Sequence, residues 1–261
     1  MNWLAQFNFD LLILFTLILT RVSGLVMTAP IYGSSDVPIQ ARALLAFSLA
    51  VLVTPTQFGT LIEPPGTLLN YLIFIGSELL VGVALGLGVL VLFSGVQVAG
   101  QLIGRVSGTA LSDVYDPAFG EEVPQFARLL FLLAMAVFVS LGGHRIVMAG
   151  LLDTFEAIPP GSRLVPLSLA DTFERLLTQS FALGIRASAP VVTALLLATV
   201  VLGLISRTLP QLNVLMLGFG LNAILTFGVL ALTLGAAAWV FQDQIEPAIE
   251  MLVEAFVLPT S

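Results

Sequence analysis

The residues that could do chemistry in this chain are few. The sequence has one histidine, His144, no cysteine, and nine basic residues that are all arginine. Without lysine it can form neither a phosphate-binding G-x-x-x-x-G-K-[ST] loop nor a Schiff base, and one histidine excludes an H-E-x-x-H zinc motif. Zinc and iron–sulfur sites of the Cys/His kind are excluded in the same way. We therefore expect no catalytic residues, no metal and no cofactor.

Three charged residues stand inside apolar runs, namely Arg21, Glu78 and Arg186. A lone charge is costly in such surroundings, so each is a candidate functional residue. An Arg–Glu pair would offset the desolvation of both partners. The sequence leaves open whether these charges pair structurally, reach toward a membrane interface or take part in transport.

The composition indicates a membrane protein, because 58% of the residues are apolar and 10% are charged, against about a quarter charged in soluble domains. The net charge of −7 argues against a nucleic-acid partner, which needs a basic surface. The first residues carry no positive charge ahead of the apolar run, so we interpret that run as a retained helix rather than a signal peptide.

Apolar segments set the expected fold, because about 20 mostly apolar residues are needed to span roughly 30 Å of hydrocarbon. We predict an all-α protein of hydrophobic helical hairpins, organised as a single helical domain over residues 1–261. Arginines occur both in odd-numbered and in even-numbered connections between these segments. They therefore do not indicate which connections face the cytoplasm. The predicted apolar segments lie at about 9–31, 39–55, 67–101, 125–142, 176–206 and 212–241.

Glycines recur at four-residue spacing at Gly100, Gly104 and Gly108, from the end of the third segment onward, with a second pair at Gly82 and Gly86. Small residues at this spacing let helix backbones approach closely in a membrane. The pattern favours tight helix packing or a narrow pore lining. The alternative is a chance run in a chain with 23 glycines.

An acidic segment follows Gly108, with Asp113 and Asp116 ahead of Pro117 and with Glu121 and Glu122 after it. These residues predict a loop between two apolar helices. The sequence leaves open whether the loop enters a water-filled space or lies in bulk solvent.

A second acidic pattern lies near the C-terminus, where Glu246, Glu250 and Glu254 share one helix face. Like charges at this spacing disfavour an isolated helix. The face is either solvated or matched by a basic partner.

Two predicted helix ends carry polar residues. Gly143 and His144 follow the fourth segment, where His144 is expected to cap the C-terminal end of a helix. Arg207 ends the fifth segment as a favourable cation, and Pro210 beyond it predicts a break before the next helix. Gln211 and Asn213 then offer hydrogen bonds to a helix N-terminus or a partner, or the block is simply a rigid elbow.

An ordered set of motifs resembles the FliR/SctT family of type III secretion export-gate subunits over nearly the whole chain. Arg21 with Pro30 fits the N-terminal pattern of this family. The other matching motifs, in order, are the turn from Pro38 to Arg42, Ala99 to Gly104, Asp116-Pro117, Gly143-His144, Leu152-Asp153-Thr154-Phe155, Pro159-Pro160-Gly161, Ala189-Pro190-Val191 and the block from Leu202 to Val214.

The resemblance implies a subunit of the flagellar type III protein export gate, located in the bacterial inner membrane and the flagellar basal body. It implies a hetero-oligomer with FliP-type and FliQ-type subunits, contacted by an FlhB-type subunit, which forms a gated channel for unfolded flagellar export substrates. It also implies helical hairpins whose main neighbours are other subunits.

The same resemblance implies a plug-like or constricting loop near the channel. The residues assigned to it are Gly104, Ser107, Gly108, Asp113, Asp116 and Pro117. A competing hypothesis is a secondary transporter or permease for a small solute, motivated by Arg21, Glu78 and Arg186. That hypothesis predicts inverted internal repeats, and the sequence shows none.

Overall fold

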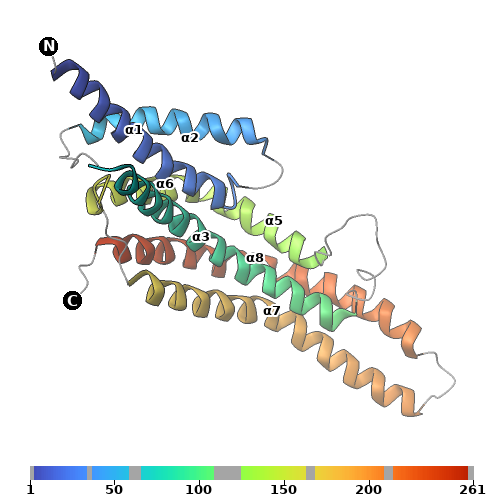
Figure 1. Cartoon of the computed structure of the whole chain (residues 1–261). Coiled ribbons are helices and arrows are strands. Elements are labelled where there is room, and N and C mark those ends of the chain that lie inside the picture. Colours follow the sequence, from blue (N-terminus) through green and yellow to red (C-terminus); the bar gives the residue numbers. More distant parts are fainter. Residues whose placement is uncertain are drawn as a thin grey trace. The chain divides into compact units, whose positions relative to one another are not determined.

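The computed structural model describes residues 3–33, 37–58, 66–108, 125–162, 168–208 and 214–257. Within these residues the chain is helical and contains no β-strand, so the predicted all-α class is confirmed (Figure 1). The elements are α1 (Trp3–Thr28), α2 (Ile39–Val53), a short 3-10 helix (Thr54–Gln57), α3 (Leu68–Ser107), α5 (Gln125–Ser140), α6 (Gly143–Ala157), α7 (Ser168–Thr208) and α8 (Val214–Val257).

Each of the six predicted apolar segments coincides with a helix, but one helix was not predicted and several others extend beyond the predicted segments. Helix α6 was not predicted, α1 begins at Trp3 instead of near 9, α3 continues to Ser107 instead of ending near 101, and α7 begins at Ser168 instead of near 176. Helix α8 continues to Val257, beyond its predicted apolar segment, and includes the residues Glu246, Glu250 and Glu254 that the sequence placed on one helix face. These stretches mix polar and apolar residues, as in Gly143–Ala157, and a search for uniformly apolar runs passes over them. The C-terminal acidic face is thus the last part of α8.

Five of the helices are long and apolar enough to cross a membrane, and α5 with α6 makes a sixth if the pair is one broken span. Helix α3 has 40 residues, which corresponds to about 60 Å at the helical rise per residue and thus to about twice the hydrocarbon thickness. The described residues therefore form an all-helical integral membrane protein.

The residues group into two compact units. Unit 1 contains Met1–Val91, Gly142–Leu176 and Glu246–Ser261, and unit 2 contains Leu92–Leu141 and Leu177–Ile245. Helices α3, α7 and α8 each contribute residues to both units. The expectation of a single helical domain stays a prediction.

Unit 1 is built around α1. Its residues Leu17, Ile18 and Leu25 are fully buried, and Phe155 of α6 joins them as a fully buried aromatic side chain. Helix α2 lies beside α1, where the rings of Phe15 and Phe47 meet edge to face at 5.6 Å between centroids. Such burial of apolar side chains is the main stabilising contribution in this unit.

Unit 2 has an aromatic centre on α3. The ring of Phe93, which is fully buried, lies 5.5 Å from that of Phe131 and 5.4 Å from that of Phe138, both on α5. Phe241 of α8 approaches the same ring at 5.3 Å. These centroid distances and the tilted planes are the preferred geometry of aromatic pairs, so Phe93 ties α3 to two neighbouring helices.

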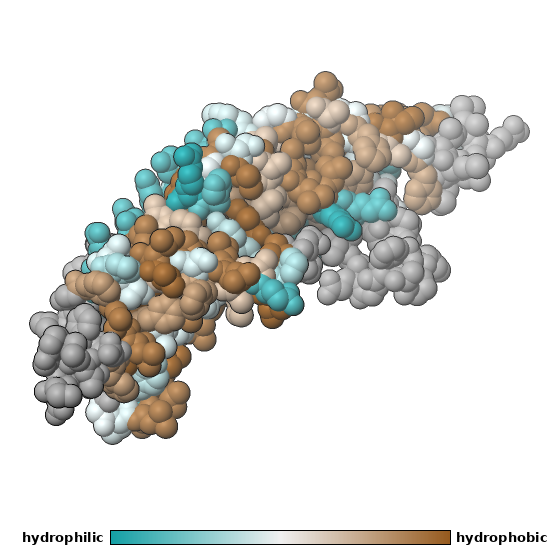
Figure 2. Space-filling view, turned by 90° about the horizontal axis from the view of Figure 1, so that it is seen from above, coloured by the Kyte–Doolittle hydropathy of each residue, from teal (hydrophilic) through white to brown (hydrophobic). Residues whose placement is uncertain are grey.

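The surface is strongly apolar. Figure 2 shows apolar residues over much of the visible face, with hydrophilic residues gathered in separate patches. Only 17% of the most apolar window of α7 and of α8 is buried, against 61% for α3. Large side chains stand out from these helices, and Leu232 of α8 is 86% exposed. Apolar surface of this extent requires lipid or protein neighbours.

Candidate functional site

Arg21 of α1 and Glu78 of α3 form a buried ion pair in unit 1. The Arg21 Nε atom donates to Glu78 Oε2 at 2.6 Å, and the two side chains are 0% and 1% exposed. A charge removed from water this completely is costly unless it is paired and hydrogen-bonded. The structure therefore brings together two of the three charges that the sequence singled out.

The remaining nitrogens of Arg21 bind the C-terminal end of α6. One terminal nitrogen donates to the Thr154 carbonyl oxygen at 2.9 Å and to Thr154 Oγ1 at 3.2 Å. The other donates to the carbonyl oxygen of Ile158 at 2.9 Å. The Thr154 carbonyl oxygen also accepts the backbone N–H of Ile158 at 2.9 Å, and the carbonyls at the C-terminal end of a helix carry partial negative charge, so a cation is favourable there. The Phe155 ring adds a cation–π contact at 4.3 Å.

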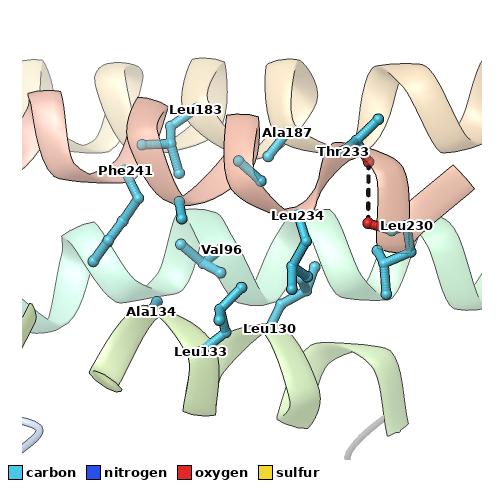
Figure 3. Close-up of a pocket in the computed structure, with 12 residues that line it drawn as sticks. Val96, Leu130, Leu133, Ala134, Leu183, Ala187, Leu230, Thr233, Leu234 and Phe241 are labelled. Atoms are coloured by element: carbon cyan, nitrogen blue, oxygen red, sulfur yellow. Dashed lines mark hydrogen bonds between the residues drawn. The ribbon is translucent and has the colours of Figure 1, made fainter. Parts of the chain in front are cut away.

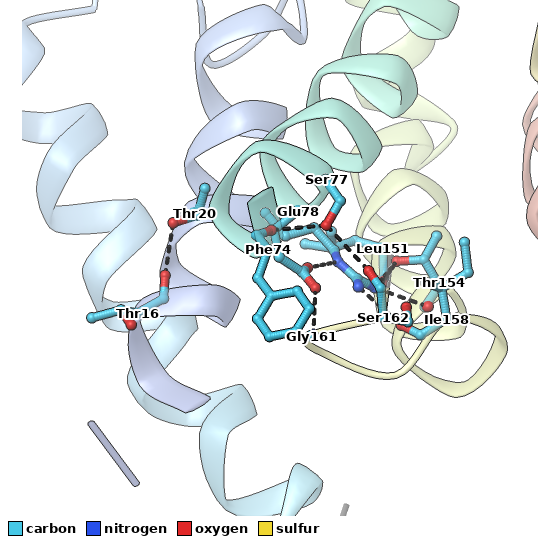
Figure 4. Close-up of polar contacts among 11 residues, drawn as sticks. Thr16, Thr20, Phe74, Ser77, Glu78, Leu151, Thr154, Ile158, Gly161 and Ser162 are labelled. Carbon is cyan, nitrogen blue, oxygen red and sulfur yellow. Dashed lines mark hydrogen bonds and ion pairs between the residues drawn. The ribbon is translucent and has the colours of Figure 1, made fainter. Parts of the chain in front are cut away.

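The turn after α6 completes the coordination of Glu78. Gly161 donates its backbone N–H to Glu78 Oε1 at 2.9 Å, and Ser77 Oγ donates to the Ser162 carbonyl oxygen at 3.1 Å. Figure 4 shows Ser77 and Glu78 facing this turn. Gly161 has φ +86°, a left-handed conformation that glycine adopts without strain. We call Arg21, Glu78, Thr154, Ile158 and Gly161 the arginine clamp.

Two glycines let α1 and α3 approach closely enough for the clamp to form. A Cβ atom on Gly24 would lie 2.9 Å from the carbonyl oxygen of Leu79, and a Cβ atom on Gly82 would collide with the carbonyl oxygen of Arg21. Gly86 is covered in the same way by Thr28 of α1. The structure thus places Gly82 and Gly86 against α1, one helical turn apart, as expected of a small-residue packing face.

Close packing recurs in unit 2. A Cβ atom on Gly100 would collide with the backbone of Ala127 in α5, and one on Gly95 would collide with Ser180 of α7. Ser94 and Ser180 also share a hydrogen bond at 3.2 Å. Sequence reasoning missed Gly24 and Gly95, because neither belongs to the four-residue series that drew attention to the other glycines.

A small cavity in unit 2 has no chemistry of its own. It measures about 20 Å³, roughly the space of a single water molecule, and its lining is apolar except for Thr233 (Figure 3). The Thr233 hydroxyl already donates to the Val229 carbonyl oxygen at 2.8 Å. A site of this size and polarity fits no substrate or cofactor.

The region assigned to a plug is described only at its start. Helix α3 continues to Ser107, so Gly104 and Ser107 are helical and buried instead of lying in a loop. Gly108 follows with φ +82° and borders a groove of about 340 Å³. The groove is lined by Ser107, Gly108, Thr199, Leu202, Gly203, Gly218, Phe219 and Asn222. The candidates Asp113, Asp116 and Pro117 lie outside the described residues.

The structure describes only some residues of the two polar helix ends that the sequence predicted. Gly142 has φ +74°, α6 begins at Gly143, and His144 lies in the first turn of α6. The expectation that His144 caps a helix C-terminus is therefore wrong, because α5 already ends at Ser140 and a new helix starts next to the histidine. Arg207 is in the last turn of α7 and is exposed. Pro210, Gln211 and Asn213 lie outside the described residues.

The third charge, Arg186, belongs to unit 2 and is exposed on α7. It has neither a hydrogen bond nor an ion pair in the part of the chain that the structure describes. Among the residues that the structure describes, no three or more His, Cys, Asp or Glu side chains are grouped so that they could bind a metal ion.

A buried and hydrogen-bonded ion pair, helices packed through glycines and wide apolar faces are the properties of a helical membrane protein whose residues serve packing. A model of the family described as "Bacterial export proteins, family 1" matches residues 12–248. The chain therefore belongs to this family of export proteins.

Three similar curated proteins are each called "Flagellar biosynthetic protein FliR". The one from Bacillus subtilis (strain 168) is 29% identical over 93% of this chain and 94% of its own length. The one from Aquifex aeolicus (strain VF5) is 31% identical over 85% of this chain and 86% of its own. The one from Escherichia coli (strain K12) is 30% identical over 87% and 84%.

Proposed function

We propose that this protein is a subunit of the flagellar type III export gate in the bacterial inner membrane, within the flagellar basal body. With FliP-type and FliQ-type subunits it forms a gated channel for unfolded flagellar proteins, and an FlhB-type subunit contacts the assembly. The observation that carries the proposal is the similarity to proteins named for flagellar biosynthesis over as much as 93% of the chain.

The distribution of buried and exposed apolar surface supports a position among other subunits. Helix α3 is apolar over a length that no bilayer covers, and most of its apolar window is buried by its own chain. Helices α7 and α8, with 41 and 44 residues, correspond to about 60 Å or more each, yet little of their apolar windows is buried. Helices of this kind need protein beside them as well as lipid.

The role is structural and requires no chemistry by the chain itself. The arginine clamp, whose donors and acceptors bind one another, fits a packing role better than a substrate site. This also weakens the small-solute transporter hypothesis, since two of the three charges that motivated it form the clamp and the third belongs to unit 2.

The experiment is purification of the tagged full-length protein from its native membrane in mild detergent. Other small helical subunits should be recovered with it in a fixed ratio, measured by native mass spectrometry. A monodisperse single chain from a host that assembles flagella would reject the proposal. Uptake of small solutes by proteoliposomes containing the purified chain would favour the transporter instead.

We also propose that the segment containing Asp113, Asp116 and Pro117 restricts the channel. Deleting residues 108–117 should make the membrane permeable to ions while the complex is recovered at its normal yield. Ion conductance that stays at the wild-type level in a normally assembled complex would count against this role.

A further inference from the structure

The face of α7 that carries Arg186 is the strongest unexplained surface in unit 2. One side of this helix packs inward, with Leu183, Ser188, Val191 and Leu195 buried. The opposite side is exposed at the helical spacing of three and four residues. Its exposed members are Arg186, Ala189, Pro190, Thr193, Leu197, Val200 and Leu204. We call these seven residues the α7 face.

Arg186 is a charge within the apolar part of this helix. The polar start of α7 ends at Gln179, and Arg186 follows seven residues later, about 10 Å farther along the helix axis. Its guanidinium has no partner among the described residues. Charged side chains inside apolar segments normally face a protein neighbour or a water-filled space and pair there.

Pro190 removes the usual helical donor of a second group at the same place. A helical residue four positions after Arg186 would donate its backbone N–H to the Arg186 carbonyl oxygen, but proline has no N–H. The guanidinium and the backbone carbonyl of one residue therefore both need partners. In membrane helices such a freed carbonyl is satisfied by a neighbouring helix, a hydroxyl or water.

If the Arg186 side chain reached toward the membrane surface, only its guanidinium would gain a partner, and its backbone carbonyl would not. An arginine side chain on a helix leans toward the N-terminus, here the polar end of α7, and can bring its charge toward water. The carbonyl of Arg186 is fixed in the backbone and cannot follow. A neighbouring helix satisfies both groups, and Ala189 and Pro190 leave room for its close approach.

A second copy of this chain is poorly suited to provide the counter-charge. Among the described residues, Glu78 is the carboxylate deep in an apolar segment, and it is buried and bound in the arginine clamp. Asp10 lies at the very start of the apolar part of α1. The remaining described carboxylates lie in the polar parts of α6, α7 and α8.

We infer that the α7 face packs against an apolar helix of a different polypeptide that carries an Asp or Glu opposite Arg186. A hydroxyl or amide donor near that carboxylate binds the carbonyl oxygen left free by Pro190. The inference deepens the proposed function, on which it rests, by naming the face and the chemistry of one subunit contact.

The test compares charge variants of the tagged full-length protein in its native membrane. Arg186→Leu and Arg186→Glu should lower the recovery of the neighbouring subunit at least tenfold. Arg175→Leu, an exposed arginine in the polar part of the same helix, is the matched control and should leave recovery unchanged. Unchanged recovery with Arg186→Leu would overturn the inference.

Cross-linking and charge rescue identify the partner directly. A photoreactive residue at position 189 should cross-link to one apolar segment that contains an Asp or Glu, and changing that acid to Arg should restore recovery with Arg186→Glu. Cross-links only to lipid or to another copy of this chain, or no rescue, would overturn the inference. The rescue decides even if Arg186→Leu lowers the melting temperature of the chain.

The two levels of proposal fail in different ways. If the wild-type chain recovers no other subunit, the proposed function fails. If the wild-type chain recovers subunits and the Arg186 variants recover them equally well, only the contact inferred for the α7 face is wrong.

Discussion

Arg21 in α1 and Arg186 in α7 both lie within apolar helices, but the first is fully buried and the second is exposed. Arg21 makes four hydrogen bonds, to Glu78, to two atoms of Thr154 and to Ile158, all within unit 1. Arg186 makes none with the residues that the structure describes. The chain thus contains one arginine that is bound by its own neighbours and one that has no such partners among the described residues.

This difference between the two arginines separates mutations that affect folding from mutations that affect assembly. Removing a partner from a buried, saturated charge leaves an unpaired group inside the protein, so mutations at Arg21 should act on the stability of the chain itself. Removing an exposed charge changes little within the isolated chain, so mutations at Arg186 should act on what the chain binds. The following predictions test this division, from the largest expected effect to the smallest.

The largest effect is expected for the ion pair. Arg21→Leu or Glu78→Ala alone should lower the free energy of unfolding by about 3 to 5 kcal/mol, because the other charge stays buried without its partner. Arg186→Leu should change the same quantity by less than about 0.5 kcal/mol. The measurement is unfolding of the purified chain in mixed micelles, followed by circular dichroism. Equal losses at Arg21 and Arg186 would remove the basis of the comparison.

A double variant checks the cause of that loss. Arg21→Met combined with Glu78→Leu replaces both charges by apolar groups and should be more stable than Arg21→Met alone or Glu78→Leu alone, since no unpaired charge remains. The double-mutant cycle gives the coupling between the two side chains. A double variant whose loss equals the sum of the single losses would show that they act independently.

Helix approach in unit 1 gives the next largest effect. Gly82→Ala should cost about 1 to 3 kcal/mol, because its new methyl group would collide with the Arg21 backbone in α1. Gly76→Ala is the matched control on the same helix, where a Cβ atom would meet nothing within 4 Å. It should be neutral or stabilise the helix by about 0.5 to 1 kcal/mol. Unfolding in micelles measures both, and a harmless Gly82→Ala would contradict the close α1–α3 contact.

The sequence predicted the apolar helices well because twenty or so consecutive apolar residues are a local signal. It predicted the clamp only in part. Arg21 and Glu78 stood out as charges in apolar runs, but their pairing joins residues 57 positions apart and cannot be read from either segment. Two other members, the carbonyl of Ile158 and the N–H of Gly161, are backbone groups that all residues except proline carry, so no residue type points to them.

The same argument explains what the sequence could not say about Arg186. Arg21 and Arg186 have equivalent local surroundings in the sequence, each a single cation among apolar residues. Only the tertiary structure shows that α6 ends beside the first, while the second faces outward. The unpredicted helix α6 and the unpredicted start of α7 have a related cause, since their polar residues lower the average hydropathy that marks the other helices.

The turn that binds Glu78 provides a smaller effect. Gly161→Ala should lower the free energy of unfolding by about 1 to 2 kcal/mol, because the residue has φ +86° and an L side chain is strained there. Gly203→Ala in unit 2 is the control, since a Cβ atom at that helical position would meet nothing within 4 Å. A loss at Gly203 equal to that at Gly161 would indicate a general intolerance of alanine instead of backbone strain.

The smallest effect separates the side chain of Thr154 from its backbone in the clamp. Thr154→Val keeps the shape of the side chain and removes a hydroxyl that accepts a hydrogen bond from Arg21 at 3.2 Å. The same arginine nitrogen retains the shorter bond, 2.9 Å, to the Thr154 carbonyl oxygen. The hydroxyl also donates to the Leu151 carbonyl oxygen at 2.6 Å, so the substitution removes two hydrogen bonds. We expect a loss of about 0.5 to 1 kcal/mol in the unfolding measurement, since the Arg21 charge keeps its other partners. A loss as large as that of Arg21→Leu would mean that the hydroxyl, and not the end of α6, holds the arginine in place.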